Sequence, residues 1–311
     1  MNLLNTIHNS ILMPISFCFS LVGISSIELS SSSKYQNNKA EIIAENAKPI
    51  LVSNQFKFTE GPAVDKKGNV FFTDQPNDRI WKYSTDGQLT LFLDKTGRSN
   101  GMYFDKKGNL LTAADEKNEL WSISPDKKIT VLLDNYQAKL FNGPNDLWID
   151  PKGGIYFTDP YYQRPYWERK KTELNGQYVY YLAKGTAVPV IVDSDLVQPN
   201  GIVGSADGKS LFIADIGNKK TYKYEISKNG ALANRTLFAE MGSDGMTLDH
   251  KGNLYLTGRG VTVFNSIGKQ IEHIEIPGWT ANVCFSGKKR DVLFITSTTA
   301  VYTLQMIVKG I

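Results

Sequence analysis

Short runs of β-branched and aromatic residues alternate with polar turns along most of the chain. Six times, a turn containing Gly, Asp and Lys precedes such a run, and the first five turn glycines lie 40 to 55 residues apart. Repeats of this length, built from turns and short strands, are typical of β-propellers. The runs that follow the turns are Val70 to Asp74, Leu110 to Asp115, Ile155 to Asp159, Leu211 to Asp215, Leu254 to Thr257 and Val292 to Thr296. The pattern therefore predicts an all-β, six-bladed propeller with four strands in each blade.

Further strands are predicted between these runs, and no long segment has the 3.6-residue apolar period of a helix. Turn dipeptides such as Asp86-Gly87 and Pro125-Asp126 separate them. Because a ring of blades must hide its edge strands, we expect Ile50 to Phe56 to pair within the blade formed by the C-terminal segment. The other predicted strands include Arg79 to Ser84, Leu89 to Leu93, Glu119 to Ile123 and Ile129 to Leu133.

The N-terminal region has a different composition. Residues 11–24 are mostly apolar or small, in a run too short to cross a bilayer. They are followed by four consecutive serines and a polar stretch that cannot bury enough apolar surface to order itself. The prediction is a signal peptide at 1–25, a polar linker at 26–44 and the propeller at 45–311, in a protein exported to the periplasm or secreted. Retention of the first segment as an N-terminal anchor is the alternative.

Composition excludes several classes of function. The 35 basic residues alternate along the sequence with 31 acidic ones, so no basic stripe for nucleic acid is visible. The two cysteines, Cys18 and Cys284, cannot build a disulfide framework or a thiolate metal site. The expected partner is a small-molecule substrate, without nucleic acid and without membrane contact beyond the N-terminal anchor, and the oligomeric state stays open.

One polar position recurs with the repeats. A carboxylate or carboxamide precedes each of the six runs at an equivalent place, and the residues are Glu60, Asn100, Asn145, Asn200, Asp244 and Asn282. A residue just before the innermost strand of a blade lies at one mouth of the central channel. Six such oxygens would form a site for a hard divalent cation, with Ca²⁺ favoured and Mg²⁺, Mn²⁺ and Zn²⁺ as alternatives. The competing interpretation is that these are turn residues, repeated because the blades are.

The residues around these positions resemble a known family. The segments are Phe58-Thr59-Glu60-Gly61-Pro62, Pro144-Asn145-Asp146-Leu147, Pro199-Asn200-Gly201, Asp244-Gly245-Met246 and Thr280-Ala281-Asn282-Val283. Together they are similar to the senescence-marker-protein/gluconolactonase (regucalcin-like) family of six-bladed propellers, from about residue 50 to the C-terminus. The resemblance implies that Glu60, Asn145, Asn200 and Asp244 hold the cation and that Asp244 is also the general acid/base.

The resemblance also implies a reaction. It predicts a metal-dependent hydrolase that opens a sugar lactone or a related lactone, an enzyme acting on carboxylic ester bonds. A phosphotriesterase-like hydrolase and a non-catalytic calcium- or ligand-binding propeller remain the alternatives. The animal gluconolactonases carry an Arg two residues before the central Asn, where this chain has Gly143, a departure that weakens the case for an aldonolactone substrate.

The remaining candidates surround this site. Asn100 and Asn145 are predicted to orient the substrate, and Arg98 and Asn282 to line the pocket. The longest interval follows Asp159 and contains Tyr161, Tyr162 and several arginines, which predicts a lid or pocket wall, or else a solvated surface hairpin. Four aspartates that end strands are predicted to bond the backbone amides of turns rather than to act in catalysis. These are Asp74, Asp115, Asp159 and Asp215.

Overall fold

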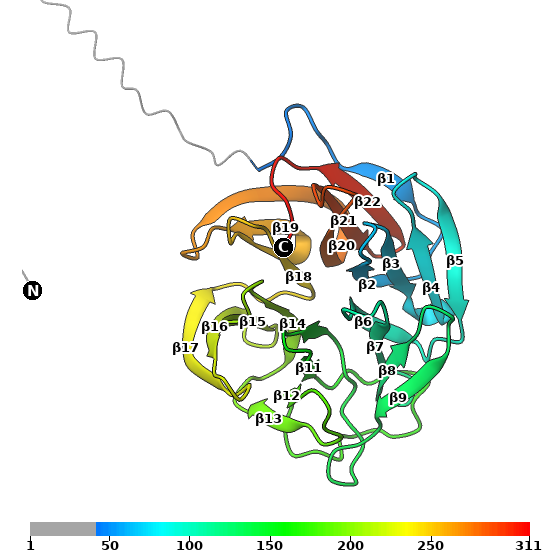
Figure 1. Ribbon diagram of the computed structural model, residues 1–311, viewed down its shortest axis with the longest axis vertical. Coiled ribbons are helices and arrows are strands. Elements are labelled where there is room, and N and C mark those ends of the chain that lie inside the picture. Colours follow the sequence, from blue (N-terminus) through cyan, green and yellow to red (C-terminus); the bar gives the residue numbers. More distant parts are fainter. Residues whose placement is uncertain (1–41) are drawn as a thin grey trace, which may run out of the picture. The chain divides into compact units, whose positions relative to one another are not determined.

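The computed structural model describes residues 42–311, which lie in one compact unit (Figure 1). The predicted signal peptide and all but the end of the predicted linker fall outside the described residues. Within 42–311 the protein is all-β, as predicted, and its one helical element is the short 3₁₀ helix η1 (Gln75–Asn77). None of these residues form a helix with the length and hydropathy needed to cross a bilayer.

Four sheets have four antiparallel strands each, joined in sequence order. The sequence predicted this for every repeat, and the predicted bounds of several strands, such as Val70–Asp74 and Ile155–Asp159, are those observed. The first sheet consists of β2 (Thr59–Val64), β3 (Val70–Asp74), β4 (Arg79–Tyr83) and β5 (Leu89–Asp94), and the second of β6 (Ser99–Phe104), β7 (Leu110–Ala114), β8 (Glu119–Ile123) and β9 (Ile129–Leu133). The third consists of β10 (Leu147–Ile149), β11 (Ile155–Asp159), β12 (Tyr178–Leu182) and β13 (Val190–Asp193), and the fourth of β14 (Pro199–Gly204), β15 (Ser210–Asp215), β16 (Lys220–Ile226) and β17 (Leu232–Ala239).

The last two repeats depart from the prediction, because they share one six-stranded sheet instead of forming two separate sheets of four. The strand β20 (Gln270–Ser286) pairs first with β19 (Leu254–Phe264) and then, through its second half, with β21 (Val292–Ser297). The remaining strands of this sheet are β18 (Met246–Leu248), β22 (Ala300–Gln305) and β1 (Ile50–Ser53). The chain runs through Pro277 and Gly278 without ending the strand.

The N-terminal strand joins this sheet at its edge, and the predicted pairing of Ile50 to Phe56 with the C-terminal segment is confirmed for Ile50–Ser53. β1 lies antiparallel to β22, with Ile50 opposite Thr303 and Leu51 opposite Tyr302. Phe56 then buries its ring against Phe72 and Trp81 of the first sheet, at centroid distances of 5.1 and 5.5 Å. The segment before Glu60 therefore joins the last sheet to the first.

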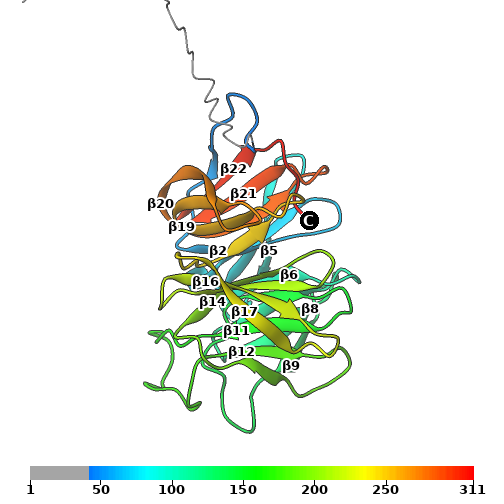
Figure 2. The same ribbon diagram turned by 90° about the vertical axis from the view of Figure 1, so that its left-hand side faces the viewer.

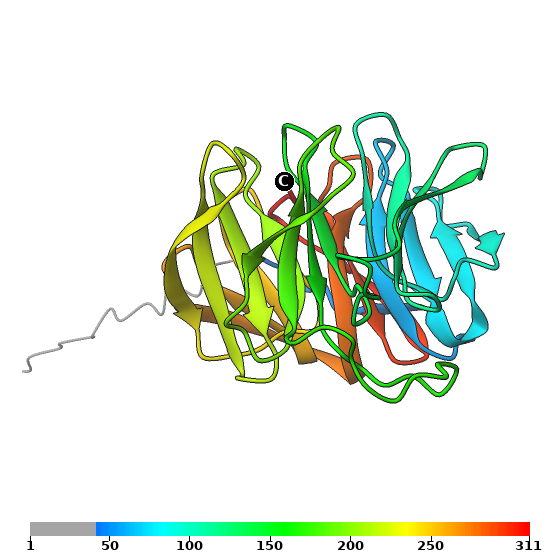
Figure 3. The same ribbon diagram turned by 90° about the horizontal axis from the view of Figure 1, so that it is seen from below.

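The sheets are arranged around a common centre, with their first strands innermost (Figure 1). β2 contacts β6, β6 contacts β10, and the contacts continue through β14 and β18 to β20, which contacts β2. Apolar side chains fill the spaces between neighbouring sheets; Phe71 packs on Phe104, and Phe72 on Phe294. The strands run between two ends of the molecule at which the turns gather (Figures 2 and 3).

We call the end that carries the turns between first and second strands the turn end, and the opposite end, where each first strand begins, the entry end. The turns at the turn end are residues 65–69, 105–109, 150–154, 205–209, 249–253 and 287–291. The six recurring polar residues all lie at the entry end.

Candidate metal and active site

The structure places the six recurring residues at equivalent positions of the inner strands. Glu60, Asn100, Asn200 and Asn282 lie within β2, β6, β14 and β20, whereas Asn145 and Asp244 each precede the strand by two residues. All are buried except Asp244, which is partly exposed. The innermost strands therefore direct oxygen-bearing side chains to one end of the ring.

Hydrogen bonds between neighbouring sheets fix this arrangement. The amide of Gly101 donates to the carbonyl oxygen of Asn145 at 2.8 Å, and the amide of Gly245 to the carbonyl oxygen of Ala281 at 2.7 Å. Threonines of the second strands reinforce them; the hydroxyl of Thr158 donates to the carbonyl oxygen of Asn200 at 2.7 Å. The inner strands are thus held by the sheets beside them as well as by their own.

Glycines that follow the site residues allow this close approach. A Cβ atom on Gly61 would lie 2.0 Å from the carbonyl oxygen of Asn100, and one on Gly245 would lie 1.9 Å from the side chain of Asn282. The dipeptides Asn100-Gly101, Asn200-Gly201 and Asp244-Gly245 resemble turns in sequence, yet their glycines have a packing role, since each one meets the neighbouring inner strand.

Asp244 has a defined hydrogen-bonding environment. Its Oδ1 accepts from Nδ2 of Asn200 at 2.9 Å, and its Oδ2 accepts from Nε1 of Trp279 at 2.8 Å. The same amide of Asn200 donates to the hydroxyl of Tyr162 at 3.0 Å. Trp279 was not predicted as a site residue; the available signal was its position three residues before Asn282.

The carboxyl groups of Glu60 and Asp244 share one region, and their charges interact. Burial raises the pKa of Glu60 well above its usual range, and the nearby charge of Asp244 raises it further. Burial also raises the pKa of Asp244, against the hydrogen bonds from Trp279 and Asn200 that lower it. Negative charge is thus costly here without a compensating cation.

Asp146 is a third buried carboxyl group, which the sequence analysis did not select. Burial raises its pKa to about 7, although the amide of Leu147 and the side chain of Asn282 donate to it and lower the value. The sequence does carry a signal for it: Asn100 and Asn200 are each followed by glycine, whereas the equivalent Asn145 is followed by Asp146.

The residues present fit a hard cation. Oδ1 of Asn100 and Oδ1 of Asn200 are buried and accept no hydrogen bond from any described residue. Carboxamide and carboxylate oxygens are the ligands Ca²⁺ prefers. Across residues 42–311, no three His, Cys, Asp or Glu side chains are clustered as metal ligands, so such a site depends on the asparagines as well as on Glu60 and Asp244.

The long segment after Asp159 folds over toward this end. Tyr162 of residues 160–177 accepts a hydrogen bond from Asn200 at its hydroxyl. Its ring centre lies 5.6 Å from the guanidinium carbon of Arg164. Burial raises the pKa of Tyr162 to about 12, so its hydroxyl stays protonated. Arg164 is close enough to Asp244 to lower the pKa of that carboxyl group.

Asp115 anchors this segment. Its Oδ2 accepts from Nε of Arg164 at 2.6 Å and from the hydroxyl of Tyr166 at 2.7 Å, and its carbonyl oxygen accepts from the indole of Trp167 at 2.9 Å. Gln75 donates to the same Oδ2 at 3.2 Å. Burial raises the pKa of Asp115, whereas the guanidinium of Arg164 lowers it.

Three of the four strand-ending aspartates behave as the sequence predicted. Asp74, Asp159 and Asp215 each accept hydrogen bonds from two consecutive backbone amides. These amides belong to the residues three and two positions before Glu60, Asn145 and Asn200, respectively. Asp115 is the exception, because Asp78 accepts the amides of Thr96 and Arg98 in its place. The prediction for Asp115 was therefore wrong, and its carboxylate is available to the 160–177 segment.

The side chains of Arg98 and Tyr161 make their contacts with residues outside the recurring set. Nη1 of Arg98 donates to the carbonyl oxygen of Pro76 at 2.8 Å, and its guanidinium stacks 4.5 Å from the ring of Tyr166. The hydroxyl of Tyr161 donates to Gln163, and its ring faces Trp167. Among the described residues, neither side chain hydrogen-bonds to any of the six recurring residues.

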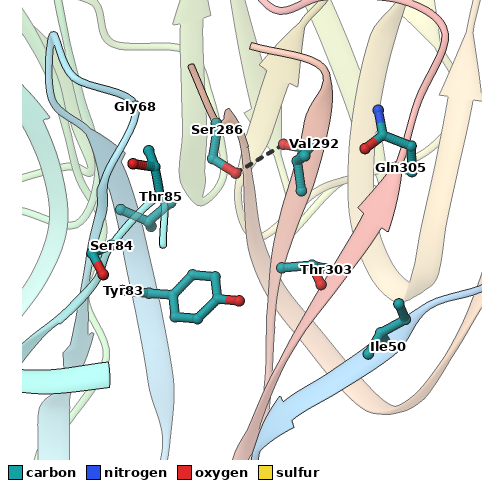
Figure 4. A pocket seen from close by; sticks show the side chains of 11 residues that line it. Ile50, Gly68, Tyr83, Ser84, Thr85, Ser286, Val292, Thr303 and Gln305 are labelled. Atoms are coloured by element: carbon teal, nitrogen blue, oxygen red, sulfur yellow. Dashed lines mark hydrogen bonds between the residues drawn. The ribbon is translucent and has the colours of Figure 1, made fainter. Parts of the chain in front are cut away.

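A cavity of about 240 Å³ lies elsewhere, between the first and last sheets (Figure 4). Its lining includes Tyr83, Thr85, Ser286, Thr303 and Gln305, and none of its eleven lining residues is acidic or basic. None of the recurring polar residues lines it, and it lies where the first and last sheets meet.

Replacing Asp115 by alanine is expected to release the 160–177 segment, because Arg164 and Tyr166 lose their shared acceptor. Tryptic cleavage within the segment, after Arg169, Lys170 or Lys171, should become at least about tenfold faster at unchanged melting temperature. Asp134→Ala, an exposed aspartate at the same end, is the control and should cleave at the original rate. Equal rates for both variants would contradict the anchoring role.

Comparison with known proteins agrees with this architecture. The family model described as "SMP-30/Gluconolactonase/LRE-like region" matches residues 58–299. A gluconolactonase of Zymomonas mobilis is 27% identical over 292 residues, covering 84% of this chain and 82% of that protein. A lactonohydrolase of Aspergillus oryzae is 27% identical over 204 residues, covering 57% of this chain and 47% of that one.

Solved structures show the same fold. A gluconolactonase of Xanthomonas campestris superposes with a TM-score of 0.80 at 27% identity, covering 86% of this chain and 91% of that one. Regucalcin of Agrobacterium tumefaciens, described as a calcium-binding protein, superposes with a TM-score of 0.72 at 19% identity, covering 85% and 96%. The matched region contains all six recurring residues, and the chain belongs to the SMP-30/gluconolactonase/LRE-like family of propeller proteins.

Proposed function

We propose that this protein is a metal-dependent lactone hydrolase, built as a six-bladed propeller with one divalent cation at the entry end. The observation that carries the proposal is the convergence of Asp244, Asn200 and Glu60, together with two buried amide oxygens that lack donors. The gluconolactonase and lactonohydrolase relatives support the reaction class.

Glu60, Asn145, Asn200 and Asp244 would hold the cation, with Ca²⁺ as the best match to oxygen ligands alone. The side chain of Asn145 makes no hydrogen bond within residues 42–311, so its oxygen is free to coordinate. When bound, the ion supplies positive charge that polarises the lactone carbonyl. It also offsets the electrostatic cost of burying Glu60 beside Asp244.

Asp244 is placed to move the proton. It accepts a proton from water as the water oxygen bonds to the carbonyl carbon of the lactone. The proton then passes to the ring oxygen as the bond between that oxygen and the carbonyl carbon breaks, which leaves a hydroxy acid. The hydrogen bonds from Asn200 and Trp279 fix the orientation of the carboxylate during both transfers.

Tyr162 and Trp279 would position the substrate. Both bear a polar hydrogen at the site, and Trp279 exposes 41% of its surface beside Asp244. An exposed aromatic face next to the reacting groups suits a ring-shaped, hydroxylated ligand. Export to the periplasm or outside the cell remains a prediction from the N-terminal sequence.

Removal of the metal tests the proposal. Purified protein treated with a chelator and then freed of it should lose lactone hydrolysis in a pH-stat assay, and added Ca²⁺ should restore it. A panel of sugar lactones, unsubstituted lactones and a phosphotriester separates the reaction classes. Activity that survives complete metal removal would contradict the mechanism, and turnover of the phosphotriester alone would favour the other hydrolase class.

A further inference from the structure

The turn end of the molecule, opposite the candidate active site, is strongly basic. Nine exposed lysines lie in the six turns between first and second strands, namely Lys66, Lys67, Lys106, Lys107, Lys152, Lys209, Lys251, Lys288 and Lys289. The turns between third and fourth strands open at the same end and add Lys127, Lys128, Lys184, Lys228 and Lys269, all exposed.

This charge is concentrated and not an average property of the chain. The turns at this end hold fifteen basic and eight acidic side chains, an excess of seven, whereas the whole chain has 35 against 31, an excess of four. Four of the eight aspartates point into their own turns; Asp65, Asp105, Asp150 and Asp249 each accept two backbone amides there. The lysines therefore dominate the surface at this end.

Large apolar side chains project at the same end. Ile267 is 83% exposed and Val188 69% exposed, and both lie in turns between third and fourth strands. Ile307 and Ile311 are half exposed in the C-terminal segment, which is tied to this end by the bond from the amide of Gly310 to the carbonyl oxygen of Arg290. Apolar tips surrounded by lysines are the combination that binds a lipid interface.

The chain also enters the fold here. Ile43 pairs with Met306, and the amide of Ile307 donates to the carbonyl oxygen of Ile42. The apolar stretch at residues 11–24 precedes this point in the sequence. A bilayer in contact with the turn end leaves Asp244 and the 160–177 segment facing solvent.

We propose that the turn end docks on a bilayer containing anionic lipids, through its ring of lysines and the projecting isoleucines and valine. Each lysine contributes by attraction to the negative surface potential, so binding falls as salt rises. The apolar tips add contact that salt does not screen.

The test is co-sedimentation of the full chain with vesicles of phosphatidylcholine containing 30% phosphatidylglycerol, compared with pure phosphatidylcholine. The variant Lys67→Glu/Lys107→Glu/Lys251→Glu/Lys289→Glu changes four lysines whose ammonium groups make no hydrogen bond or ion pair within the described residues. We expect its partition onto the anionic vesicles to fall at least about hundredfold. The matched control, Lys57→Glu/Lys117→Glu/Lys139→Glu/Lys171→Glu, changes net charge equally at the entry end and should stay within about fivefold of the original.

A second pair of variants examines the apolar contribution. Ile267→Ser should lower binding that persists in 0.5 M salt, whereas Val197→Ser, half exposed at the entry end, should not. Equal binding to both vesicle types, or equal losses for the two quadruple variants, would overturn the proposal. So would direct binding of soluble polyphosphate together with no binding to either vesicle type, since the basic face would then recognise a soluble polyanion.

Discussion

Asp244→Asn is expected to lower the rate of lactone hydrolysis about 10³-fold. General acid–base catalysis contributes about 10²- to 10⁴-fold, and asparagine cannot accept the proton of the attacking water. The carboxylate now accepts from both Asn200 and Trp279, and an asparagine oxygen can face only one of them. The replacement also removes one negative charge from the proposed metal site. Initial rates in a pH-stat with saturating Ca²⁺ measure the loss.

Asp195→Asn provides the matched control. This aspartate lies in the segment before β14, with its side chain 73% exposed, and its replacement makes the same chemical change away from Asn200. It should keep full activity. If Asp244→Asn retained more than about a tenth of the original rate while binding metal normally, another group would have to move the proton.

Gly61→Ala should cause the largest loss of stability of any single methyl addition in the first sheet. Gly61 has φ of +48°, and a Cβ atom there would overlap the carbonyl oxygen of Asn100 at 2.0 Å. Because the overlapping atom is backbone in the neighbouring inner strand, β2 and β6 must separate. Strain and overpacking together should lower the free energy of unfolding by about 3 to 5 kcal/mol. Urea unfolding followed by fluorescence measures the change, and lactone hydrolysis should fall because Glu60 moves with Gly61.

The control is Gly185→Ala. Gly185 has φ of +81°, and a Cβ atom there would meet nothing within 4 Å. This variant isolates the backbone strain and should cost about 1 to 2 kcal/mol. Similar unfolding midpoints for the two variants would show that the inner strands can separate at no cost.

The repeating turn made most of the fold predictable. A Gly at positive φ recurs before each second strand, and in four of the turns an Asp accepts two of its own turn's amides, so local chemistry alone locates Val70–Asp74 or Ile155–Asp159. The shared strand β20 was not predictable in this way. Pro277 and Gly278 normally mark a turn, yet tertiary pairing carries the strand through them, with the hydroxyl of Ser297 donating to the carbonyl oxygen of Pro277.

The site was predictable where it repeats and not where it depends on distant partners. Counting along the repeats locates Glu60, Asn200 and Asp244, which the structure brings to the same end of the ring. Asp115 looks like the other strand-ending aspartates in sequence, and only contacts about 50 residues further along the chain distinguish it. The basic turn end was missed for a related reason, since lysines alternate with aspartates in sequence but half of the aspartates at this end bond to their own turns.

The shared strand β20 has a mechanical consequence. Its two halves belong to the two repeats that contribute Asp244 and Asn282. One continuous strand therefore holds these two repeats together. The other neighbouring sheets are linked by loops, by side-chain packing and by a few hydrogen bonds between inner strands. Relative motion of the sheets should therefore concentrate at those contacts. The part of the ring between Asp244 and Asn282 should be its most rigid part.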